Sequence, residues 1–154
     1  MLGSNSRFFY SSTEDLGKTK DIMVNFLINH NTKNSVIDVY IEAFDYFTNY
    51  PYKFDGATIL KDVKVVPNLD IFAMLHDYIY VFFNTSVNIK DKTKSDFIYS
   101  KEMERCGLPT SVSWFRFSLL ILTHFIFTPY ELIRGKRMSN KQRSDFKKLN
   151  NKFK

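Results

Sequence analysis

A change in hydrophobic period after Pro67 constrains the fold of this chain more than any other feature of its sequence. From Leu69 onward, apolar residues recur at the three- and four-residue spacing of a helix with one buried face. Asn68 or Asp70 supplies a short side-chain acceptor for the free amides of the first turn. We therefore predict a helix that runs to about Phe83.

A second helix is predicted by a start signal and a stop signal. Thr93 and Asp96 are three residues apart and resemble a capping box, with Asp in place of the usual Glu. Gly107 can adopt the left-handed conformation that commonly ends a helix. The predicted helix therefore extends from about Thr93 to Gly107.

The third predicted helix is strongly apolar, beginning at Ser111 or Ser113 and ending near Gly135. Residues 112–133 could span a bilayer, because about 20 residues suffice. Four residues within this stretch are costly or disruptive in hydrocarbon: Arg116, His124, Pro129 and Glu131. We therefore predict a buried helix or a helix on a membrane surface rather than a span.

Two segments before Pro67 predict β-structure. Ser35–Phe47 is rich in β-branched and aromatic residues, and Thr58–Val66 could pair with it across the turn-forming residues between them. The predicted fold class is α+β, mainly α, with a small β hairpin or sheet followed by a three-helix core.

Composition and charge divide the chain into three predicted parts: an arm at 1–20, a single globular domain at 21–135 and a basic tail at 136–154. The tail holds eight Lys or Arg and one acid, which gives it a charge of +7. Because the net charge of the whole chain is +6, the rest of the chain carries −1. By charge alone, the tail could contact nucleic acid or an anionic partner surface. A single cysteine, Cys106, excludes an internal disulfide and favours an intracellular or virion protein.

The first two predicted helices carry a possible hydrolytic constellation of His76, Tyr80 and Asp96. If these helices pack antiparallel, Asp96 can bind one nitrogen of the His76 ring while the other nitrogen takes a proton from water. Tyr80 lies one turn after His76. The alternative interpretation is a buried polar cluster that fixes how the two helices meet.

A cation site is the second part of this hypothesis. Asp77 follows His76 and points to a different side of the helix, where it could hold Ca²⁺ together with the Asp55-Gly56 loop. Such a cation would stabilise the oxyanion of an ester under hydrolysis. Apart from Ca²⁺, the sequence gives no sign of a small-molecule cofactor.

The string H-D-x-x-Y at His76–Tyr80, followed by Asp96, resembles phospholipase A2, particularly the disulfide-free form of parvovirus capsid proteins. That form has a Y-x-G-x-G calcium loop before the histidine, and residues 52–56 occupy the corresponding place here. Phe54 stands where the first loop glycine belongs, which disfavours a backbone that wraps a cation. The resemblance implies a phospholipase A2-like antiparallel helix pair.

The order of motifs from about Tyr52 to Gly135 is similar to that of a tailed-phage protein family of unknown function. The matching pieces are a D-G-A-S/T-I turn, H-D-x-x-Y, an aspartate with an aromatic residue three positions on, then methionine, glycine and an apolar helix.

This resemblance implies a phage-encoded protein with a phospholipase-like helical pair. The leading functional interpretation is a virion or tail-associated structural protein, made in the host bacterial cytoplasm, with other virion proteins as partners. The alternative is a Ca²⁺-assisted lipid esterase that acts on the host membrane. Its catalytic residues would be His76, Asp96 and Tyr80, and its metal site would use Asp77, Asp55 and Gly56.

Overall fold

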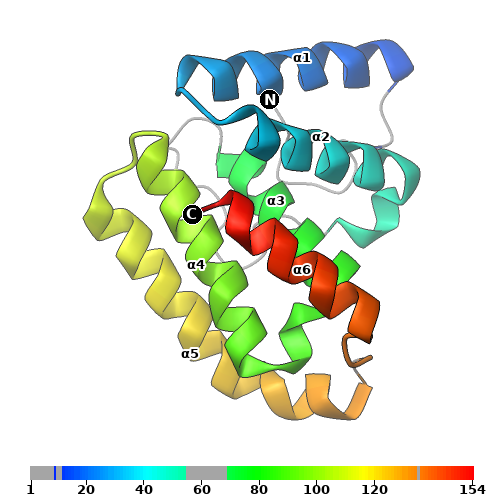
Figure 1. The fold of residues 1–154 in the computed structure, drawn as a ribbon, viewed down its shortest axis with the longest axis vertical. Helices are drawn as coiled ribbons and strands as arrows, with labels where there is room; N and C mark the ends of the chain where they lie inside the picture. Colours follow the sequence, from blue (N-terminus) through cyan, green and yellow to red (C-terminus); the bar gives the residue numbers. More distant parts are fainter. Residues whose placement is uncertain (1–8, 10–11, 55–68, 135) are drawn as a thin grey trace. The chain divides into compact units, whose positions relative to one another are not determined.

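The computed structural model describes Phe9, residues 12–54, 69–134 and 136–154, with the backbone alone at 69 and 123–134. Within the chain there are two compact units, Met1–Tyr78 and Ile79–Lys154. Helix α3 (Leu69–Phe83) begins in the first unit and ends in the second. Each unit is described by itself (Figure 1).

The first unit contains a helical hairpin of α1 (Thr13–Asn29) and α2 (Asn34–Asn49), followed by the short 3₁₀ helix η2 (Pro51–Lys53). Ser12 caps α1 by accepting a hydrogen bond from the Asp15 amide at 3.2 Å. Asn31, at φ 53°, adopts the left-handed conformation that ends the helix. Lys20 of α1 pairs with Asp45 of α2 at 2.7 Å, so an ion pair links the two helices.

Aromatic rings fill the centre of this first unit. Phe9 lies against Phe44, Phe47 and Phe54 with ring centroids 5.1–5.7 Å apart, and Phe47 also contacts Phe54 at 5.1 Å. All four side chains are at most 3% exposed. Two further ring pairs join α3 to this core: Phe26 with Phe72, and Tyr46 with Tyr78. The unit is therefore held together mainly by aromatic packing.

The second unit contains the end of α3, the 3₁₀ helix η3 (Thr85–Val87), α4 (Ile89–Arg105), α5 (Thr110–Arg134) and α6 (Asn140–Lys152). Helices α4 and α5 run side by side (Figure 1). Hydrogen bonds join Ser100 to Ser113 and Lys92 to Leu120, so an earlier residue of α4 contacts a later residue of α5. The two helices are therefore antiparallel.

A tight turn at Gly107 makes this antiparallel hairpin possible. Gly107 has φ 93°, its amide donates to the Glu104 carbonyl, and the Leu108 amide donates to the Met103 carbonyl, both at 3.0 Å. This pair of bonds defines a Schellman motif, which satisfies carbonyls that a helix end leaves without partners. The sequence prediction that Gly107 ends the helix is confirmed.

Helix α6 packs within the second unit through its apolar side. Phe146 is 3% exposed and contacts the Phe83 ring with centroids 5.6 Å apart. Gln142 donates to the Phe82 carbonyl at 2.8 Å, and with Ser139 it forms a capping box. Residues 140–152 are thus helical, whereas the division into arm, domain and tail stays a prediction.

The predicted α+β fold class is wrong, because the described part of the chain contains helices and no strand. The predicted strand Ser35–Phe47 lies in α2. Its buried side chains follow helical spacing, and burial of this face outweighs the β-preference of its branched residues. The buried side chains of α2 are Val36, Ile37, Val39, Tyr40, Ala43, Phe44 and Phe47. The other predicted strand, Thr58–Val66, lies outside the described residues.

The predicted helices have mixed outcomes at their ends. Helix α3 ends at Phe83 as predicted and begins at Leu69, and Asn68 lies outside the described residues. Helix α4 begins at Ile89, four residues before the predicted start, because Asn88 is its cap and accepts from the Lys90 amide at 2.9 Å. In the described parts of the chain, no helix has the length and apolar character needed to cross a membrane.

Candidate buried polar site

The residues of the predicted constellation fall in both units. In the first unit, His76 and Asp77 are neighbours on α3, and the His76 Nδ1 lies 3.7 Å from the Asp77 Oδ1. That distance is too long for a hydrogen bond and close enough for a charge contact if the imidazole is protonated. His76 is 8% exposed, so its ring is nearly enclosed.

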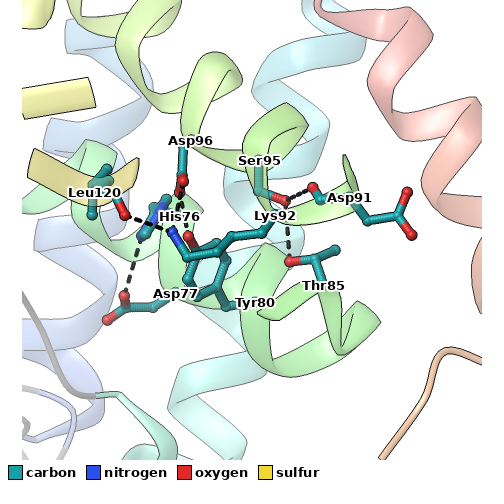
Figure 2. Close-up of polar contacts among 9 residues, drawn as sticks. All are labelled: His76, Asp77, Tyr80, Thr85, Asp91, Lys92, Ser95, Asp96 and Leu120. Atoms are coloured by element: carbon teal, nitrogen blue, oxygen red, sulfur yellow. Dashed lines mark hydrogen bonds and ion pairs between the residues drawn. The ribbon is translucent and has the colours of Figure 1, made fainter. Parts of the chain in front are cut away.

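In the second unit, Asp96 is the centre of a buried group of polar side chains (Figure 2). The Tyr80 hydroxyl donates to Asp96 Oδ1, and the Lys92 Nζ donates to Oδ2 at 2.7 Å. Lys92 also donates to the Leu120 carbonyl on α5 at 2.9 Å. We call Tyr80, Lys92, Asp96 and the Leu120 carbonyl the Lys92 cluster.

The charged groups of the Lys92 cluster are buried, so each needs a partner that replaces water. The side chain of Asp96 is 0% exposed and that of Lys92 is 8% exposed. Removing one ion from water costs several kcal/mol, roughly, unless an opposite charge and hydrogen bonds replace the solvent. The cluster provides both, and it ties the end of α3, α4 and α5 to one carboxylate.

Neighbouring hydrogen bonds extend this polar contact along α4. Ser95 donates to the Thr85 hydroxyl at 3.1 Å or to the Asp91 carbonyl at 3.0 Å, two contacts also drawn in Figure 2. Farther along, Arg116 Nη1 donates to the Tyr99 hydroxyl at 3.3 Å. Arg116 is 3% exposed, so α5, like α4, contributes a buried cation.

These polar contacts along α4 end near the turn at Gly107, where hydroxyl groups join α4 to α5. The Ser100 and Ser113 hydroxyls are 2.6 Å apart, and Ser113 lies 2.9 Å from Glu104 Oε1. Hydrogen bonds from Lys101 and then from Ser113 hold the pKa of Glu104 below its usual value. Polar contacts thus follow the whole length of α4.

The predicted cation site is only partly within the described residues. Asp55 and Gly56 lie outside the described residues. Within the ranges that are described, no three His, Cys, Asp or Glu side chains are grouped so as to hold a metal ion. Phe54, which stands at the position of a loop glycine in the phospholipase motif, is 2% exposed and belongs to the aromatic core of the first unit.

Tyr78 and Cys106 are both buried. Burial, followed by a hydrogen bond to Glu42, raises the pKa of Tyr78 above its ordinary value. Burial also raises the pKa of the Cys106 thiol to about 11, so this thiol is protonated and unreactive near neutral pH. The side chains of His124 and Glu131 lie outside the description.

Lys92 is the residue of this site that sequence reasoning missed. Its four-residue spacing from Asp96 is visible in the sequence, but such pairs usually lie on exposed helix faces. No protein-family model, curated protein or solved structure matches this chain. The interpretation of the site therefore depends on its own chemistry.

Proposed function

We propose that this protein is a non-catalytic structural component of a virion or phage tail, in which the H-D-x-x-Y and aspartate motif positions helices. The observation that carries the proposal is the ion pair between Asp96 and Lys92 at 2.7 Å, both almost fully buried. The virion assignment rests on the order of sequence motifs.

The Lys92 ammonium opposes a catalytic use of Asp96. In a hydrolytic pair, the aspartate stabilises the positive charge that forms on histidine when it takes a proton from water. Here the Asp96 charge is compensated by Lys92, and each of its oxygens accepts a hydrogen bond within the second unit. A carboxylate held in this way stabilises an imidazolium less well and fixes helix positions better.

The position of Phe54 supports the same conclusion. A calcium loop needs a backbone that can curve around the ion, and glycine provides that freedom. This chain uses the position to place a ring between Phe9 and Phe47. The residue therefore contributes to the core of the first unit.

Replacing Lys92 tests the structural role. Lys92→Met leaves the buried Asp96 charge without its cation, and we expect the free energy of unfolding to fall by about 3–5 kcal/mol in urea titrations. Lys90→Met is the matched control, because Lys90 is exposed on the same helix and should change stability by less than about 0.5 kcal/mol. Equal stability of both variants would contradict the role of the cluster.

A lipid hydrolysis assay tests the esterase alternative. Wild-type protein and His76→Ala are incubated with phospholipid vesicles in Ca²⁺ or in EDTA, and fatty acid release is measured. We expect no Ca²⁺-dependent release above that of the variant. Release that requires both Ca²⁺ and His76 would overturn the non-catalytic proposal, and absence of the protein from purified phage particles would overturn the virion assignment.

A further inference from the structure

A groove lies between α4 and α6 in the second unit, and none of its lining residues belongs to the Lys92 cluster. Its volume is about 290 Å³. Apolar side chains line it: Phe97 and Ile98 of α4, and Phe153, which directly follows α6. Three exposed lysines also line it: Lys94, Lys101 and Lys154. The groove therefore combines an apolar surface with positive charge.

The size of the groove limits what it can hold. Sites for drug-sized ligands and cofactors usually measure roughly 300–1,000 Å³, so this groove is at or below their lower limit. It has room for an apolar side chain of a partner. A cleft between two helices is also a common docking place for an amphipathic helix that inserts such an anchor.

The lysines define the charge of the occupant. Lys94 and Lys101 are seven residues apart on α4, which places them about 10 Å apart along the helix axis. Acidic residues with the same spacing on a second helix would lie opposite both. The second unit as a whole carries fifteen Lys or Arg against six Asp or Glu, so its field also attracts an acidic segment.

The existing ion pairs of Lys94 and Lys101 can be exchanged for pairs with a docking partner. Lys101 pairs with Glu104 at 2.7 Å and Lys94 with Asp91 at 3.3 Å, and both lysine side chains are about half exposed. The acids are more buried, with Asp91 8% and Glu104 17% exposed, but water reaches both ammonium groups, so each lysine can turn to a second acid while water replaces it at the first. Lys101 also lies 5.6 Å from the centroid of the Phe97 ring, so its charge is held beside the apolar surface.

The geometry points to a docking site for an acidic amphipathic helix of a partner protein. One apolar side chain of that helix enters the groove beside Phe97, Ile98 and Phe153. Acidic residues on either side of this anchor pair with Lys94 and Lys101, and a third acid reaches Lys154. The inference does not depend on whether His76 is catalytic.

A designed peptide tests this inference. The probe is a fluorescein-labelled helical peptide of about 18 residues, with one central Leu flanked by Glu residues seven positions apart. Fluorescence anisotropy measures its binding to the full chain. We expect saturable binding that weakens with salt, and weaker binding of peptides with Leu→Ala or with Lys in place of Glu.

Two matched triple variants locate the binding site. Lys94→Gln with Lys101→Gln and Lys154→Gln should weaken binding by about tenfold. Lys141→Gln with Lys147→Gln and Lys148→Gln removes the same charge from exposed positions outside the groove and should change it by less than about twofold. Circular dichroism checks that both variants fold.

Three results would overturn the inference. The first is equal weakening in both triple variants, which would mean attraction by overall charge alone. The second is no binding of the acidic peptide to wild-type protein. The third is binding to anionic phospholipid vesicles, lost in the groove variant, in place of peptide binding, because that would assign the groove to a membrane surface.

Discussion

The two units of this protein differ in the contacts at the centre of their helices. The first unit has aromatic rings at its centre and carries seven Lys or Arg against ten Asp or Glu, a formal charge of −3. The second has buried hydrogen bonds and an ion pair along α4 and carries a formal charge of +9. The net charge of +6 therefore hides two units of opposite sign.

Because of this difference, different changes should destabilise each unit. Aromatic packing depends on volume and shape, so it is sensitive to cavities and insensitive to salt. A buried ion pair depends on both partners being present, so the loss of one partner costs more than the pair contributes. The predictions below use these dependences to separate the units.

The largest expected effect in the first unit follows from Phe54→Ala. This change leaves a cavity against Phe9 and Phe47 and should lower the free energy of unfolding by about 3–5 kcal/mol. Tyr52→Ala is the control, because Tyr52 is 70% exposed nearby. Urea titrations at low and high salt should show the same loss. A loss that depends on salt would break the comparison between the units.

An intermediate effect is expected in alkali from Cys106 in the second unit. Its folded pKa of about 11 exceeds the ordinary value of 9.0, so the thiol is protonated in both states below about pH 9. Above that pH the unfolded thiol ionises first, and stability falls until the pH passes the folded pKa.

The measurement compares urea titrations at pH 8, 9, 10 and 11. Wild-type protein should lose on the order of 2 kcal/mol more than Cys106→Ala between pH 9 and 11. The variant removes the thiol and keeps the other alkaline titrations, so the difference in slope reports Cys106 alone. Parallel pH profiles would show that burial of this thiol does not affect stability.

The smallest effect concerns the start of α6. Ser139→Ala removes the side chain that accepts from the Gln142 amide at 3.2 Å, and should cost about 1 kcal/mol. Hydrogen exchange should show faster exchange in the first turn of α6 and unchanged exchange in α1 and α2. Ser144→Ala, at an exposed position inside the same helix, is the control. Faster exchange in both units would contradict an effect confined to the second.

The sequence was informative where local signals agree with burial. The end of α3 at Phe83 was predictable from apolar spacing, and the end of α4 at Arg105 from the glycine stop signal at Gly107. Helix α2 was not, because β-branched residues favour strands locally and only its buried face makes it a helix.

The candidate site was predictable only in part. His76, Asp77, Tyr80 and Asp96 stand out by their motif. The sequence prediction, however, paired Asp96 with His76 and did not include the hydrogen bond from Tyr80 to Asp96. The burial of Lys92 was not visible, because a lysine four residues from an aspartate is normally solvated. Its role depends on the Leu120 carbonyl, which no sequence pattern marks.

The turn at Gly107 also has a consequence for the order of folding. Contacts between α4 and α5 become less local with distance from this turn: 13 residues separate Ser100 from Ser113, 17 separate Tyr99 from Arg116, and 28 separate Lys92 from Leu120. Shorter loops close at lower entropic cost, so we expect the hairpin to form from the turn outward. Lys92 then leaves water last, when the nearby helices are already in place to receive its charge.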